Sequence, residues 1–230
     1  RAKEIEKNEG NLVRVALSPL TPTKFLGQVW PIASKQYPDL RIQLVPFENE
    51  KNIVWNMLSH LGSDGQVDIV VATYDEDFLE RRNCTALKLR DLQLSICMSS
   101  THKLAQKEKI SIEDLVEATR RRGGLLLRSD DWMRGYDNVK EIFTHDERIE
   151  KEFYDFLTMD ILNRCGNSNY FLLATESWIF SHPLIKAVPL DINATLPFGA
   201  IHSKKPSEPV KKFLRIVDFV NLEYKNFQLW

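Results

Sequence analysis

The alternation of short apolar runs with amphipathic segments constrains the fold of this chain more than any other feature. Residues 67–72 read VDIVVA, a nearly continuous apolar run that is typical of a strand buried on both faces of a parallel sheet. Strand patterns also occupy residues 12–17 and 40–45, and the segments between the three runs, 23–36 and 50–61, carry apolar residues at helical spacing. This β-α-β-α-β order predicts right-handed crossovers, with ligands bound outside the carboxyl ends of the strands.

The second half of the chain starts a similar series, so we expect a second lobe. Two strand-like runs meet around residues 86–98, and residues 196–222 return to a strand followed by a long helix. The sequence therefore predicts an α/β fold with two Rossmann-like lobes joined by two crossover strands. We place lobe I at residues 11–91 and 193–230 and lobe II at residues 92–192, with a cleft between the lobes.

Charge, cysteine usage and hydropathy exclude several classes of protein. The 31 Lys and Arg residues nearly balance the 32 Asp and Glu residues, so this segment lacks the positive field that binding to a phosphate backbone requires. The three cysteines lack CxxC spacing, and the five histidines lack metal-ligand spacing. No apolar run approaches the roughly 18–20 residues of a membrane span. We expect a soluble cytoplasmic protein with buried or free thiols, no metal, no cofactor and no membrane contact.

Four segments carry a family pattern in the same order along the chain. They are LVRVALSPLTPTKFLGQVWPIASKQYPDLRIQLV from residue 12, VDIVVA from residue 67, LQLSICMSSTHKLAQKEKISIEDL from residue 92 and PSEPVKKFLRIVDFV from residue 206. Together they resemble the effector-binding (regulatory) domain of LysR-type transcriptional regulators, and the chain departs from the family's pattern at residues 164–169 and 174–176. The resemblance implies a fold similar to that of type II periplasmic binding proteins. It also implies that an effector bound between the two lobes controls transcription.

The resemblance also implies partners. In that family the first lobe's helix and the following strand pair between subunits, so Phe25, Trp30 and Ile42 are predicted interface residues, and a core role stays open for Trp30. We expect a homodimer, with a tetramer in the full-length protein. DNA would be contacted only through an N-terminal winged helix-turn-helix that is missing from these residues. Residues 1–10 would then be the end of the connecting linker helix.

Hydroxyls and one arginine follow the predicted strands, where a ligand is expected. Ser18 and Thr21 precede a predicted helix, and Thr73 follows the run at 67–72, where the resemblance implies a ligand-contacting hydroxyl. Hydroxyls at a helix start either hold an anion together with backbone N–H groups or simply cap the helix. The candidates in the second lobe are Ser99, Ser100, Arg128, Ser129 and Thr158. We expect a small-molecule effector, a carboxylate or another anion. Arg128 either clamps it or is a solvated or salt-bridged group.

Two other functions stay open on the same architecture. One is a periplasmic solute-binding protein of an uptake system, and the other is an enzyme. An enzyme needs a nucleophile or an acid–base pair, yet no GxSxG, P-loop or GxGxxG motif occurs, and Asp130 with Asp131 lies next to a predicted loop. We therefore predict a sensor that is not an enzyme. Its effector would shift the arrangement of the lobes, with a coupling of about 1–3 kcal/mol.

Overall fold

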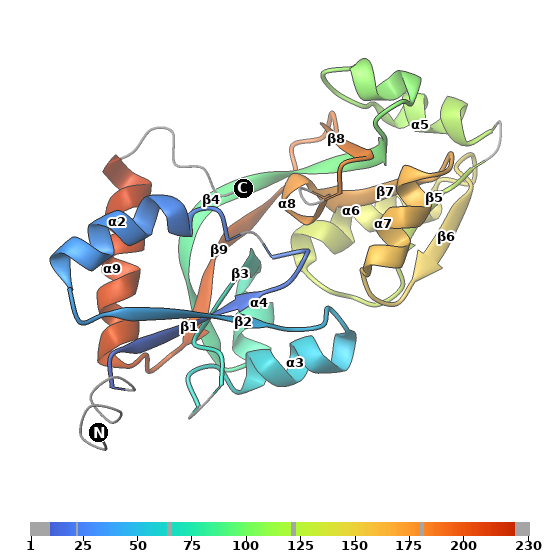
Figure 1. The fold of residues 1–230 in the computed structure, drawn as a ribbon. Helices are drawn as coiled ribbons and strands as arrows, with labels where there is room; N and C mark the ends of the chain where they lie inside the picture. Colours follow the sequence, from blue (N-terminus) through green and yellow to red (C-terminus); the bar gives the residue numbers. More distant parts are fainter. Residues whose placement is uncertain (1–9, 22, 64–65, 121–122, 180–181, 224–230) are drawn as a thin grey trace. The chain divides into compact units, whose positions relative to one another are not determined.

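The computed structural model describes residues 10–21, 23–63, 66–120, 123–179 and 182–223 (Figure 1). The predicted linker helix therefore lies almost wholly outside the described residues. The chain divides into two compact units, which we call unit 1 (residues 1–90 and 198–230) and unit 2 (residues 91–197). Two strands, β4 (Cys84–Ser99) and β9 (Thr195–Ser203), begin in one unit and end in the other.

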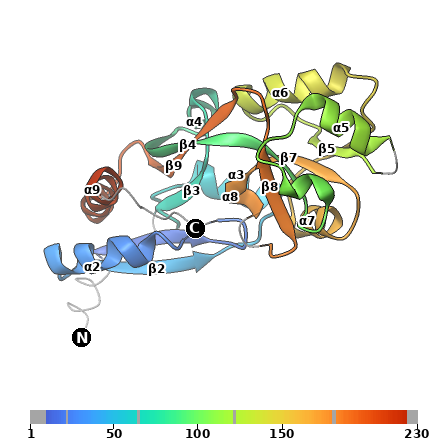
Figure 2. The ribbon, with the colours of Figure 1, turned by 90° about the horizontal axis from the view of Figure 1, so that it is seen from above.

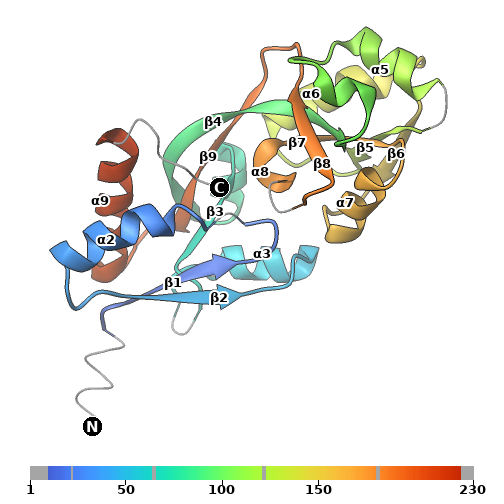
Figure 3. The same ribbon diagram turned by 45° about the horizontal axis from the view of Figure 1, so that its top comes forward.

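Unit 1 is built on a mixed sheet with the strand order β2-β1-β3-β9. β1 pairs in parallel with β2 and β3, and β9 runs antiparallel to β3. Helices α2 and α9 pack against each other, and α9 also contacts β1 (Figure 3). The elements are β1 (Leu12–Leu17), α2 (Leu26–Gln36), β2 (Arg41–Pro46), α3 (Lys51–Ser59), β3 (Ile69–Thr73), α4 (Glu76–Arg81) and α9 (Glu208–Glu223).

Unit 2 has a second mixed sheet, in which β4 lies between β7 and β8 and runs antiparallel to both. β5 pairs in parallel with both β6 and β7, and helices α6 and α7 lie on opposite sides of β5 and β7 (Figure 2). The elements are the 3-10 helix η1 (Lys103–Gln106), α5 (Ile112–Thr119), β5 (Leu125–Arg128), α6 (Arg134–His145), β6 (Lys151–Tyr154), α7 (Met159–Gly166), β7 (Phe171–Thr175), α8 (Glu176–Ile179) and β8 (Ile185–Pro189).

The apolar patterns explain most of these elements. Four of the five residues of β3 and all five of β7 are buried, as expected for strands covered on both faces. In α9 an apolar stripe faces the core, with Val210, Phe213, Val217 and Val220 buried. No helix in the described ranges is long and apolar enough to cross a bilayer.

Three elements differ from the sequence prediction. The first helix begins at Leu26 rather than at residue 23. The two runs around residues 86–98 form the single 16-residue strand β4. Helix α4 was missed because its sequence is acidic, yet the Asp75 carboxylate caps it by accepting the N–H of Phe78 at 2.7 Å.

A capping box at the start of α5 gives a test of local stability. The Ser111 hydroxyl accepts the N–H of Asp114 at 3.2 Å, and the Asp114 carboxylate accepts the N–H of Ser111 at 3.0 Å. We expect Ser111→Ala to lower the free energy of unfolding by about 1 kcal/mol in urea titrations. Ser34→Ala, the same change inside α2, should not destabilise the protein, because alanine is the better helix former. Equal losses in the two variants would contradict the capping role.

Candidate functional site

Two buried hydroxyls lie at the ends of neighbouring parallel strands in unit 1. Ser18 directly follows β1, Thr73 is the last residue of β3, and Val15 of β1 lies opposite Ile69 of β3. Ser18 is 6% exposed and Thr73 is 2% exposed. Because parallel strands end at the same edge of a sheet, this register brings Ser18 and Thr73 to one edge.

The hydroxyl of Thr73 is a buried polar group that the fold of unit 1 does not satisfy. Its Oγ1 atom is buried and has no hydrogen-bond partner in the described part of the chain. Leaving a buried hydroxyl unpaired costs about 1–3 kcal/mol, and native proteins contain few such groups. A ligand atom that bonded to Thr73 would remove this cost.

The hydroxyls of Ser18 and Thr21 shape the turn after β1. Their oxygens lie 2.9 Å apart and share one hydrogen bond, and the N–H of Leu20 donates to the Ser18 oxygen at 3.2 Å. Two hydroxyls that share one hydrogen bond keep one O–H proton for another acceptor. The pair can therefore donate to a ligand without disrupting the turn.

The sequence left two roles open for the hydroxyls before α2, anion binding with backbone N–H groups and helix capping, and the structure shows neither at the start of α2. The N–H groups of Leu26, Gly27 and Gln28 each donate at 3.0 Å to the carbonyl three residues earlier. The N-cap residue is Phe25, whose side chain makes no capping hydrogen bond. Those three donors are satisfied within the turn, so the candidate site depends on side-chain hydroxyls rather than on the helix terminus.

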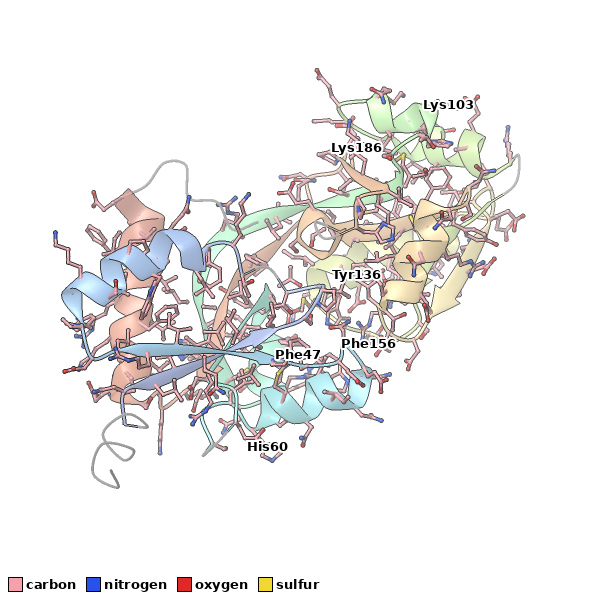
Figure 4. The ribbon with its side chains drawn as sticks, viewed as in Figure 1. Phe47, His60, Lys103, Tyr136, Phe156 and Lys186 are labelled. Atoms are coloured by element: carbon pink, nitrogen blue, oxygen red, sulfur yellow. The ribbon has the colours of Figure 1, made fainter. Side chains whose placement is uncertain are left out.

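Arg128, the last residue of β5, is buried and paired with a carboxylate. It is 4% exposed, and its guanidinium donates to both carboxylate oxygens of Asp130. The guanidinium carbon also lies 5.2 Å from the centre of the Trp132 ring and 5.1 Å from that of Phe156, which Figure 4 labels. The salt bridge with Asp130 is therefore present, and the contact of Arg128 with an effector stays a prediction.

Ser129 and Thr158 lie at the same edge of the unit 2 sheet as Arg128. Ser129 is exposed, and its N–H donates to the carbonyl of Tyr154, which extends the pairing of β5 with β6. Thr158 is the N-cap residue of α7, and its side chain makes no capping hydrogen bond. The structure therefore groups these two residues with Arg128.

Ser99 and Ser100 lie at the opposite edge of that sheet. β4 runs antiparallel to β7, with Cys97 opposite Leu172, so β4 ends where β7 begins. The carboxyl ends of β5 and β7 are at the other edge, because these two strands are parallel. The structure does not bring Ser99 and Ser100 together with Arg128.

Sequence reasoning missed a buried hydroxyl pair at the end of β7. Thr175 is 0% exposed and Ser177 is 3% exposed, and their hydroxyl oxygens lie 2.8 Å apart in a shared hydrogen bond. Thr175 ends a buried apolar run just as Thr73 does, so the same signal was present in the sequence. This pair belongs to the carboxyl edge with Arg128.

The three residues predicted at a dimer interface are placed differently from one another. Phe25 is 0% exposed and lies in the core of unit 1, so it offers no surface to a partner. Trp30 and Ile42 are half-buried. Ile42 lies on β2, which has a paired neighbour on one side only, and Leu44 on the same strand is 44% exposed. Trp30 and Ile42 keep surface available for the predicted contact.

Tyr136 connects α6 to the end of β5. Its hydroxyl oxygen accepts the backbone N–H of Arg128 at 3.2 Å, and it is also hydrogen-bonded to Tyr154. Complete burial raises the pKa of Tyr136 to about 12 and raises the pKa of Tyr154 well above its ordinary value. Both hydroxyls stay protonated at neutral pH and act as structural groups.

The three cysteines are buried free thiols, as predicted. Burial raises the pKa of Cys84 and Cys97, and it raises the pKa of Cys165 to about 12. Thiols of this kind are protonated at neutral pH and react slowly. Within the described ranges, no cluster of three or more His, Cys, Asp or Glu side chains is arranged to hold a metal ion.

Comparison with known proteins identifies the family. The model of the LysR substrate binding domain matches residues 6–120. The Probable RuBisCO transcriptional regulator of Synechocystis sp. (strain ATCC 27184 / PCC 6803 / Kazusa) is 26% identical over 113 residues, which are 49% of this chain and 31% of that protein. The matched segment thus spans less than a third of the length of this curated relative.

Solved structures share the fold at low sequence identity. The effector binding domain of BenM with its effector benzoate has a TM-score of 0.57, 18% identity and 94% coverage of both chains. The effector binding domain of QuiR in complex with shikimate has a TM-score of 0.63 and 11% identity, and the match covers 93% of this chain and 98% of that one. The predicted type II periplasmic-binding-protein-like α/β fold is confirmed. The chain belongs to the LysR substrate binding domain family.

Proposed function

We propose that this chain is the ligand-sensing regulatory domain of a LysR-type transcriptional regulator, and that its effector is a small carboxylate or another small polar molecule. Family membership supports the sensing role, and the curated relative is named a transcriptional regulator. The BenM and QuiR domains were solved with benzoate and shikimate, which are both carboxylates.

The buried, unpaired hydroxyl of Thr73 is the observation that carries the proposal. Ser18 ends the neighbouring strand, and its hydroxyl pair with Thr21 keeps one proton to donate. A carboxylate oxygen can accept hydrogen bonds from these hydroxyls. The hydroxyls can therefore orient the effector without a helix terminus or a cation. We therefore assign Thr73, Ser18 and Thr21 as the principal effector contacts.

The carboxyl edge of unit 2 supplies the remaining proposed contacts. These are Arg128, Ser129 and Thr158, to which we add Thr175 and Ser177. Asp130 accepts the Nε–H and one Nη2–H of Arg128, so a ligand carboxylate would have to bind this guanidinium through its other N–H groups. Arg128 accordingly has a secondary part in our proposal. Ser99 and Ser100 are no longer proposed as effector contacts, because they lie at the other edge.

The proposed role of the effector is conformational rather than catalytic. A ligand shifts an equilibrium between two arrangements only by its difference in affinity for them, typically about 1–3 kcal/mol. The family match favours this role over that of a solute-binding protein of an uptake system. We propose that DNA is contacted through a head domain outside this chain.

Self-association completes the proposed function. Trp30 on α2 and Ile42 on β2 retain surface, and β2 is an edge strand of the unit 1 sheet. We propose that they lie in a homodimer contact, with a tetramer in the full-length protein. Phe25 supports α2 from inside and is left out of the interface.

A thermal-shift screen of small carboxylates tests the sensing role. A ligand that binds only the folded state and is present at 100 times its Kd stabilises that state by about 2.7 kcal/mol. We expect at least one member of a panel that includes benzoate and shikimate to raise the melting temperature. A panel without any stabilising member would contradict the proposed effector class.

Thr73→Val separates stability from binding. The change replaces an unpaired buried hydroxyl with a methyl group, so we expect the free energy of unfolding to rise by about 1–3 kcal/mol. The same change should weaken effector binding about tenfold in calorimetry, because one hydrogen bond to the ligand is lost.

Thr119→Val is the matched control for that experiment. Thr119 is equally buried at 2% exposure, but its hydroxyl already donates to the Leu115 carbonyl at 2.8 Å. We expect this variant to gain no stability and to keep its effector affinity. If Thr73→Val is destabilised, or binds the effector as tightly as the unmodified domain, Thr73 is not a ligand contact.

Trp30→Glu tests the dimer contact. A buried charge at a subunit interface is unfavourable, so we expect a folded monomer by size-exclusion chromatography with light scattering. Ile53→Glu is the control, since Ile53 on α3 is 38% exposed and lies outside the proposed contact. A Trp30→Glu protein that keeps the mass of the unmodified dimer would rule out this interface.

A further inference from the structure

Unit 2 has a polar pocket that the proposed effector contacts do not use. Its volume is about 380 Å³, and its lining includes Ser99, Thr101, His102, Lys103, Asn167 and Asn169. We call it the distal pocket, because it lies where β4 ends and β7 begins, at the edge of the sheet opposite Arg128. Figure 4 shows Lys103 at one end of unit 2 and Tyr136 with Phe156 at the other.

The end of β4 supplies hydrogen-bond donors to the distal pocket. The hydroxyl oxygens of Ser99 and Thr101 lie 3.0 Å apart and share one hydrogen bond, which leaves one O–H proton. His102 accepts the N–H of Leu104 at Nδ1, at 3.2 Å. The ring proton of the neutral imidazole therefore sits on Nε2.

The charge of the lining favours an anion. The residues around the pocket include the lysine Lys103 and no carboxylate. Lys103 lies 3.7 Å from Glu117, but both side chains are about two-thirds exposed, and an exposed pair of this kind contributes little. Burial, with a smaller effect from Lys103, lowers the pKa of His102, so this ring donates a proton as a neutral group.

The other wall of the pocket suits a hydroxylated ligand. The side-chain N–H of Asn167 donates to the Asn163 carbonyl at 2.8 Å, so its side-chain oxygen keeps acceptor capacity. Asn169 adds a second exposed amide. The pocket volume falls within the roughly 300–1,000 Å³ typical of small-molecule sites, which leaves room beyond a single tetrahedral ion.

We propose that the distal pocket binds the phosphate group of a small hydroxylated molecule. Lys103, the His102 Nε2–H and the free hydroxyl proton of the Ser99 and Thr101 pair donate to the phosphate oxygens. The amides of Asn167 and Asn169 bond to hydroxyl groups of the ligand. This site is independent of the effector contacts at Ser18, Thr21 and Thr73.

Calorimetric titration with two probes, glycerol 3-phosphate and inorganic phosphate, tests the proposal at constant ionic strength. We expect glycerol 3-phosphate to bind more tightly, because inorganic phosphate lacks groups for the asparagine wall. Lys103→Ala should weaken its binding about tenfold, since a charge-assisted hydrogen bond is lost. Lys103→Arg should retain most of the affinity.

Two control variants locate the binding. Lys109→Ala removes a lysine of the same unit that is paired with Asp191 outside the pocket lining, and it should leave the affinity unchanged. Thr73→Val should also leave it unchanged, whatever it does to the effector. The proposal is overturned if glycerol 3-phosphate does not bind, if it binds no more tightly than inorganic phosphate, or if Thr73→Val abolishes its binding. Equal losses in the Lys103→Ala and Lys109→Ala variants would show a general charge effect and would overturn it too.

Discussion

The pairing of β1 with β3 is the constraint on which the candidate site of unit 1 depends. Asp68, just before β3, accepts the N–H of Arg14 through its carboxylate at 2.7 Å and donates its own N–H to the Arg14 carbonyl at 2.8 Å. A slip of one residue would break both bonds and turn every side chain of β3 to the other face. Burial raises the pKa of Asp68, and the Arg14 N–H partly offsets this effect. The one charged residue in an apolar run thus fixes the register that aligns Ser18 with Thr73.

Most elements of the fold were predictable because burial requires apolar residues at a characteristic spacing in the sequence. A strand covered on both faces, such as β7, needs a continuous apolar run, and the helix α9 needs a stripe at helical spacing. Helix α4 has no such stripe, since only Phe78 is buried in it and a capping carboxylate defines its start. The start of α2 was misplaced because its first turn is held by backbone bonds rather than by a side-chain cap.

The candidate site was only partly predictable, because the sequence of a strand does not show whether it runs parallel or antiparallel to its neighbours. Thr73 follows a buried run, and its position at a carboxyl edge followed from the parallel pairing of β1 and β3. Ser99 also follows a buried run, but β4 is antiparallel to β7, and this reversal moves it to the opposite edge. The sequence also left two roles open for Arg128. The turn after β5 pairs Arg128 with Asp130, and this pairing depends on the conformation of the turn rather than on a local sequence pattern.

The bond between the Tyr136 hydroxyl and the Arg128 N–H has a mechanical consequence. It joins the last residue of β5 to the first turn of α6, and because the Tyr136 hydroxyl stays protonated at neutral pH, its charge does not change over the physiological range. We therefore expect a displacement of the last residue of β5 to move the first turn of α6 with it.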